Sequence, residues 1–160
     1  MTTTPVPTLK GVRDLFEGLL GRDVNTTQGV PIEDKTNPAP IYSVFVDDRK
    51  QMRVVVVTTL PLMGSLAAGL ALLPKGMVEA SIEDGVLAGQ LMDNWNEVAN
   101  IMAAIFNGGE SPHLRYFVSH FPPERVPNDV RSAAGVLGAR LDVNATVSGY
   151  LKGAMSVVIL

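Results

Sequence analysis

The side chains best suited to chemistry in this sequence gather on one face of a predicted helix. Asp93, Glu97 and Asn100 are separated by four and three residues, which places them one helical turn apart on a shared surface. Asn96 and Gln90 flank them. A carboxylate can pair with a cation, and a neutral carboxamide both donates and accepts hydrogen bonds. This spacing therefore indicates a polar binding surface.

A long helix between Ser81 and Phe106 must position this polar face. Ser81 or Asp84 can cap its start, and the run Asn107-Gly108-Gly109 can end it. Apolar residues recur on its opposite side at about 100° per residue and predict the surface that faces the core. They are Leu87, Leu91, Trp95, Val98, Ile101, Met102 and Ile105.

A solvated surface without function is the simplest alternative, because amphipathic helices commonly expose acids and amides. Two features favour a functional interpretation. The face contains no lysine or arginine that could pair with Asp93 or Glu97. Asparagine is also unfavourable within helices, because its side chain competes for backbone hydrogen bonds. Four asparagines nevertheless lie in or directly after this helix: Asn94, Asn96, Asn100 and Asn107.

The rest of the pattern predicts an α+β fold with a largely antiparallel sheet. Residues 1–7 form a tail that we expect to be flexible, followed by one domain over residues 8–160. Residues 22–40 indicate a long loop with a short strand at 30–32. Further helices are predicted at Thr8–Gly21, Pro61–Leu73 and Asn128–Leu137, and strands at Tyr42–Val46, Met52–Thr58, Leu114–His120, Arg140–Val147 and Ala154–Leu160.

Composition excludes several function classes. The 160 residues include no cysteine and only two histidines, so we expect no metal site. A net charge of −3 provides no basic surface for nucleic acid or an anionic membrane. The most apolar stretch, Leu60–Leu73, is shorter than the roughly 20 residues that span a bilayer. No glycine-rich phosphate-binding signature occurs. We therefore expect a cytoplasmic protein that binds neither nucleic acid nor membrane.

The polar face also resembles the signature of a known family. Asp93, three residues, Glu97, two residues, Asn100, 22 residues and Pro123 match the pattern of the CheC/CheX/FliY phosphatases. No other Glu-x-x-Asn occurs in the chain, so the sequence is most similar to the single-motif CheX type. The resemblance implies a CheC-like fold, with the sheet packed against helices and the motif on a long central helix.

The resemblance also implies an activity, namely hydrolysis of the aspartyl phosphate on a CheY-type response regulator. Asn100 would then position the attacking water, and Glu97 would form a salt bridge with the regulator's active-site lysine. Asp93, Asn96 and Gln90 would assist docking, and Pro123 would shape the loop after a strand. The regulator would supply Mg²⁺, so no cofactor is expected in this chain.

Other functions remain open from the sequence. The chain could bind a receiver domain without speeding hydrolysis, as an interaction protein like those of the flagellar switch. It could instead share only the fold, with residues 93–100 as a solvated surface. CheX-like proteins also form dimers, and the apolar C-terminal strand could pair with a second copy across a sheet edge. A homodimer is therefore a further expectation.

Overall fold

A computed structural model describes residues 3–160, which form five α-helices and one six-stranded sheet. The helices are α1 (Leu9–Leu20), α2 (Leu60–Leu70), α3 (Lys75–Asp84), α4 (Gly89–Met102) and α5 (Asn128–Ala134), with a 3-10 turn η1 (Ala103–Phe106). The strands are β1 (Val24–Gln28), β2 (Ile41–Val46), β3 (Met52–Thr58), β4 (Arg115–His120), β5 (Arg140–Val147) and β6 (Lys152–Ile159). Each strand pair is antiparallel, in the order β1-β5-β6-β3-β2-β4, so the predicted α+β class is confirmed.

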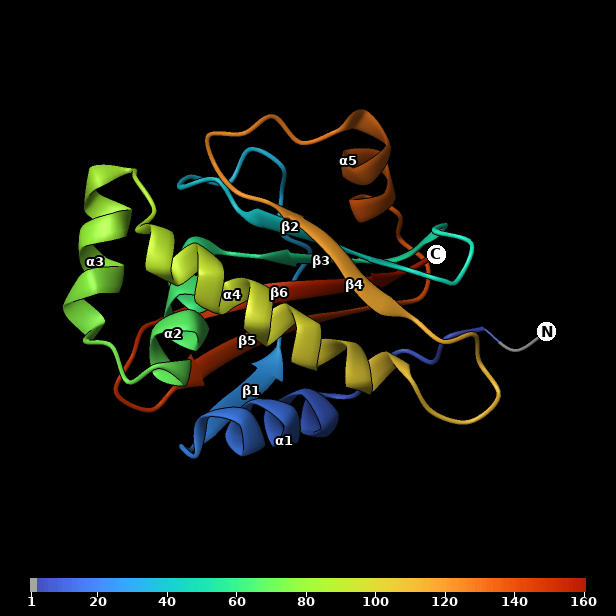
Figure 1. The fold of residues 1–160 in the computed structure, drawn as a ribbon, viewed down its shortest axis with the longest axis horizontal. Helices are drawn as coiled ribbons and strands as arrows, with labels where there is room; N and C mark the ends of the chain where they lie inside the picture. Colours follow the sequence, from blue (N-terminus) through green and yellow to red (C-terminus); the bar gives the residue numbers. More distant parts are fainter. Residues whose placement is uncertain (1–2) are drawn as a thin grey trace.

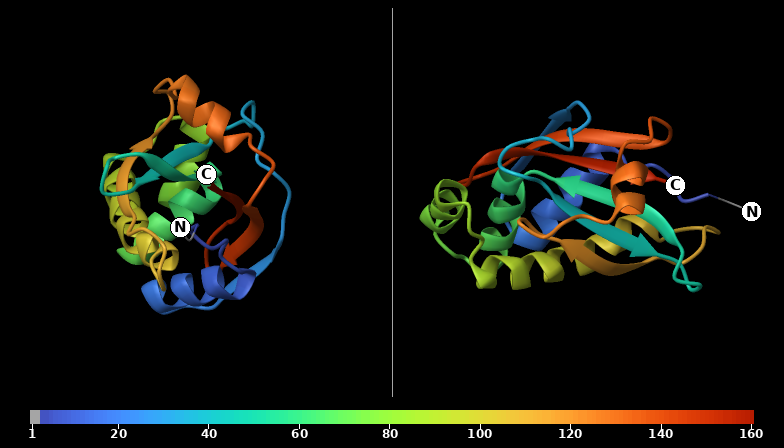
Figure 2. Two further views of the ribbon diagram at one scale, coloured as in Figure 1. Left: turned by 90° about the vertical axis from the view of Figure 1, so that its right-hand side faces the viewer. Right: turned by 90° about the horizontal axis from the view of Figure 1, so that it is seen from above.

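Helices cover both faces of the sheet. Strand β2 is buried along its whole length, as expected for a strand with neighbours on both sides and layers above and below. The large core lies between one face and helices α1, α2 and α4. A smaller apolar cluster lies under α5 on the other face. Figure 1 shows α4 running across the front beside β4, and the left view of Figure 2 shows α1 and α5 on opposite sides of the strands.

The first predicted helix is confirmed, and a residue at each of its ends caps it. The Thr8 side-chain oxygen accepts a hydrogen bond from the Gly11 N–H at 2.9 Å and starts α1. Gly21 ends the helix in the left-handed conformation, with φ of 65°, and donates its N–H to the Glu17 carbonyl. Of the seven-residue tail predicted before it, Met1 and Thr2 lie outside the described residues, and Thr4 is buried.

The prediction of one long helix over Ser81–Phe106 is wrong. The chain instead forms α3 and α4, which meet at a break after Asp84. Gly85 adopts a left-handed φ of 68° and donates its N–H to the Ser81 carbonyl, which ends α3. The apolar spacing continues across the break, so periodicity alone concealed it. The motif therefore lies on the 14-residue helix α4.

The prediction of an irregular loop over residues 22–40 is also wrong in part. Val24–Gln28 form the edge strand β1, which pairs with β5, and the strand expected at 30–32 is absent. Only Val24 of this strand is buried. Because an edge strand can expose most of its side chains, it lacks the apolar alternation by which strands are found.

One asparagine of α4 holds the helix against α2. The Asn94 side-chain amide donates to the Ala67 carbonyl at 3.0 Å. Ala67 lies in the last turn of α2, where carbonyl groups lose their partners within the helix. Asn94 therefore satisfies a carbonyl at the end of a neighbouring helix, which is a structural role.

We predict that Asn94→Ala is less stable than Asn100→Ala by about 1 kcal/mol, the usual contribution of one hydrogen bond. Both substitutions gain the same helix propensity, because each replaces asparagine by alanine within α4. The difference between them therefore isolates the bond to Ala67. Urea unfolding followed by circular dichroism measures it. Equal stabilities of the two variants would contradict this role for Asn94.

Candidate functional site on helix α4

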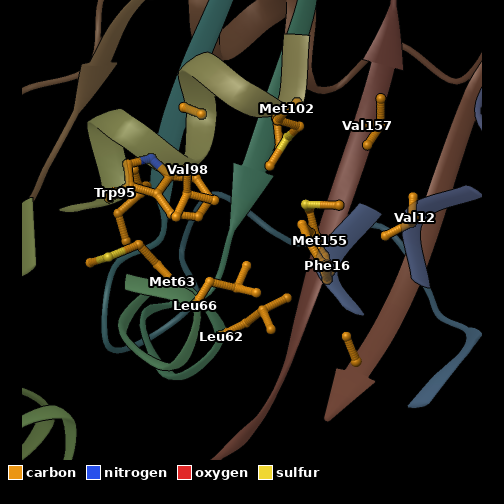
Figure 3. Packing of buried hydrophobic residues seen from close by; sticks show 14 of the residues in the cluster. Val12, Phe16, Leu62, Met63, Leu66, Trp95, Val98, Met102, Met155 and Val157 are labelled. Carbon is orange, nitrogen blue, oxygen red and sulfur yellow. The ribbon is translucent and has the colours of Figure 1, made fainter. Parts of the chain in front are cut away.

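Helix α4 is anchored to the core by one side. Trp95, Val98 and Met102 are fully buried, and Figure 3 shows the Trp95 ring projecting from the helix toward Met63 of α2. Leu91 and Ala99 complete this buried side. The apolar side predicted from the sequence therefore does face the core, except for Ile101, which is only half-buried and lies outside the core cluster. Its burial fixes the rotation of the helix and thereby determines which residues point outward.

The five predicted site residues of this helix lie together on the opposite side. Gln90, Asp93, Asn96, Glu97 and Asn100 are all exposed. Among residues 3–160, no lysine or arginine forms an ion pair with either carboxylate. The surface therefore carries two unneutralised carboxylates and several amides. We call these five residues the outer face of α4.

The asparagines of this region do not share one purpose. Asn94 bonds to α2, as described above. Asn107 closes the loop before β4, because its side chain donates to the Leu114 carbonyl and accepts from the Leu114 N–H, each at 2.7 Å. Two of the four asparagines that suggested a functional helix therefore serve the fold. Asn96 and Asn100 remain on the outer face.

A buried polar network lies beneath the outer face. The Trp95 indole N–H donates to the hydroxyls of Ser43 on β2 and Ser119 on β4, at 3.1 Å each. The two serine oxygens are 2.7 Å apart. The Tyr116 hydroxyl lies 2.6 Å from the Ser119 oxygen and 2.5 Å from Oδ1 of Asn96. Burial raises the pKa of Tyr116, so its hydroxyl keeps its proton at neutral pH.

This network was not predicted from the sequence. Helical spacing identified Trp95 only as an apolar core residue, and no role was predicted for Tyr116 or for the two serines. A signal was present for Ser43, which interrupts the otherwise apolar strand Ile41–Val46. A hydroxyl in a buried strand requires a hydrogen-bond partner. The sequence could not identify that partner, because the two serines are 76 residues apart in the chain.

Pro123, the last residue of the motif, lies apart from the helix in the chain segment after β4. The Glu124 N–H donates to the Phe121 carbonyl at 2.9 Å, so Pro122 and Pro123 occupy the two central positions of a turn. Pro123 is exposed and offers no hydrogen-bond donor. Its position is that of a turn-forming residue.

The outer face is not part of the main hollows described on this molecule. One, of about 550 Å³, is lined by residues of α1, β1 and the β5–β6 turn, and another, of about 310 Å³, lies beside the start of α2. An exposed helix side outside these hollows suits a macromolecular partner better than a small ligand.

In the described part of the chain, no group of three potential metal ligands is found, and no helix is long and apolar enough to cross a bilayer.

Comparison with solved structures reveals a shared fold at low sequence identity. FliM of H. pylori, solved in a FliM–SpeE complex, is 9% identical, with 94% of this chain and 80% of that chain covered and a TM-score of 0.56. FliM in a FliG–FliM complex from H. pylori is 10% identical, with 94% and 85% covered and a TM-score of 0.52. CheX of Borrelia burgdorferi, solved in a complex with CheY, BeF3 and Mg²⁺, is 11% identical, with 91% and 90% covered and a TM-score of 0.51.

No family model and no curated protein matches the sequence, so the similarity is one of three-dimensional structure. The similarity extends over more than nine-tenths of the chain in each of the three cases. The chain has the CheC-like fold, which it shares with this CheX and with FliM in these two complexes.

Proposed function

We propose that this protein is a phosphatase that hydrolyses the aspartyl phosphate of a CheY-type receiver domain. One observation carries the proposal. Glu97 and Asn100 are exposed on a helix anchored through its other side, and no cation of the described residues neutralises Glu97. Their spacing is that of the CheX signature, and the fold is that of a CheX solved with CheY, BeF3 and Mg²⁺.

The reaction requires little from the helper protein. Water attacks phosphorus, the bond between phosphorus and the aspartyl oxygen breaks, the aspartate carboxylate is restored on the receiver, and inorganic phosphate is released. The receiver domain would contribute the divalent cation and a lysine that neutralise the developing charge. The missing element is a water molecule held in line with the breaking bond, and positioning supplies much of the catalysis in phosphoryl transfer.

Asn100 is the side chain suited to hold that water. Its carboxamide is neutral, so it can approach a phosphoryl dianion without charge repulsion. It accepts one hydrogen bond from the water and donates another to a phosphoryl oxygen. It takes no proton, so the proton of the attacking water leaves with the phosphate. Within residues 3–160, no hydrogen bond occupies the Asn100 side chain, which leaves it free for this purpose.

The carboxylates of the outer face are suited to docking. Glu97 would repel a phosphoryl group but would attract the lysine beside it. Asp93 lies one turn earlier and extends the acidic surface, with the Gln90 and Asn96 amides at its sides. Electrostatic attraction of this kind sets the register and the rate of association.

We predict that Asn100→Ala slows the stimulated decay of a phosphorylated receiver by on the order of 10²-fold, as removal of one positioned hydrogen-bonding group does in other enzymes. The assay follows decay of a receiver domain from the same organism in Mg²⁺, with and without this protein. Asn128→Ala, an exposed amide on α5 across the sheet, is the matched control and should keep full activity. Full activity of Asn100→Ala would show that Asn100 does not position the water.

A second function is a receiver-binding or switch-type interaction protein without catalysis. The observation that favours it is the likeness to FliM, solved in complexes with FliG and with SpeE, at TM-scores no lower than that of CheX. The same decay assay separates the two functions. Measurable binding of receiver domains without any acceleration would favour the interaction protein.

We predict that Glu97→Lys weakens binding of the phosphorylated receiver and reduces the dependence of that binding on salt, because it replaces attraction for a lysine by repulsion. Isothermal titration at two salt concentrations measures both effects. Glu33→Lys makes the same charge change in the segment between β1 and β2 and should bind as the natural chain does. Unchanged affinity of Glu97→Lys would rule out its docking role.

A further inference from the structure

The polar network beneath α4 forms a chain of hydrogen bonds that runs from the core to the outer face. It begins at Ser43, which is fully buried, and passes through Ser119 and the Tyr116 hydroxyl. It ends at Oδ1 of Asn96, which is exposed. The network therefore connects the interior of the sheet to one amide of the docking surface.

The directions of the contacts around Tyr116 and Trp95 follow from the groups involved. The Trp95 N–H is only a donor, so both serine oxygens accept from it. The Tyr116 hydroxyl is the donor in both of its contacts, to the Ser119 oxygen at 2.6 Å and to Oδ1 of Asn96 at 2.5 Å. An amide oxygen only accepts hydrogen bonds, so Oδ1 is the end of the Asn96 amide that faces Tyr116.

The hydrogen bond from Tyr116 fixes the orientation of the Asn96 amide. Its oxygen is occupied by the Tyr116 hydroxyl at 2.5 Å, so the Nδ2 group must point away from the sheet. Within the described part of the chain, no hydrogen bond uses that Nδ2 group. Asn96 therefore presents two N–H donors to solvent, one helical turn before Asn100.

We propose that Asn96 selects for a hydrogen-bond acceptor on the phosphorylated face of the receiver, and that Tyr116 is the positioning residue that keeps the donor side of its amide outward. This inference rests on the proposed function, because it requires the receiver to dock on the outer face of α4. It adds a specificity element that neither carboxylate can supply, because ionised Asp93 and Glu97 only accept hydrogen bonds. A partner with an oxygen atom opposite Asn96 is favoured, and one with a lysine there gains nothing from this amide.

Asn96→Asp tests the orientation directly. Aspartate has nearly the same shape and still accepts the Tyr116 hydrogen bond, but it presents an oxygen where the amide presented donors. We expect it to weaken binding of a receiver loaded with beryllofluoride and Mg²⁺ by on the order of tenfold or more, because two acceptors then face each other. Equal affinity of Asn96→Asp and the natural chain would overturn the inference.

Tyr116 is tested by a double-mutant cycle. Tyr116→Phe frees the Asn96 amide to turn, so we expect it to weaken the same binding by a few-fold. Because Tyr116 acts through Asn96, the loss should vanish when Tyr116→Phe is combined with Asn96→Ala. An equal loss in both backgrounds would indicate general damage to the structure and would overturn the positioning role.

Tyr42→Phe is the matched control for loss of a tyrosine hydroxyl. The Tyr42 hydroxyl donates to Asp34 at 3.1 Å, and Tyr42 belongs to the cluster on the other face of the sheet. This variant should bind the receiver normally.

The outcomes of these binding experiments distinguish the proposed function from this further inference. If the natural chain binds no receiver, the proposed function fails and this inference with it, whereas binding that is insensitive to Asn96→Asp removes only the inference.

Discussion

The buried indole of Trp95 determines how helix α4 sits on the sheet. Its ring is fully buried, and its N–H, shielded from solvent, must find an acceptor within the protein. Ser43 and Ser119, paired across β2 and β4, provide two such acceptors at 3.1 Å. The helix can neither rotate nor slide without breaking these bonds. The outer face is thus fixed by an interaction on the other side of the helix.

This arrangement allows one residue type to serve distinct purposes along a single helix. Asn94 faces α2 and satisfies the carbonyl of Ala67. Asn96 faces β4, where Tyr116 holds its oxygen. Asn100 points outward between these two edges, and the described residues offer its side chain no hydrogen bond. The environment of each amide, rather than its identity, distinguishes a structural asparagine from one available to a partner.

Helical periodicity was sufficient to predict the outer face, because the rotation of α4 follows from its large apolar residues such as Trp95 and Met102. The break at Gly85 was not predictable from periodicity, since a left-handed glycine does not interrupt the apolar spacing around it. The edge strand β1 was missed because its exposed side chains resemble those of a loop. The Ser43–Ser119 pair depends on strands far apart in the chain, so no local pattern reveals it.

The shared fold leaves the activity open, because it occurs both in a CheX solved with CheY and in FliM. The decisive feature is therefore the outer face of α4, and the central claim is that a phosphorylated receiver docks there. Nuclear magnetic resonance of the side-chain amides tests it directly during titration with a beryllofluoride-loaded receiver. The account predicts that the signals of Gln90, Asn96 and Asn100 shift, while those of Asn25 and Asn128 stay unchanged. Shifts at Asn25 or Asn128 with none on α4 would contradict it.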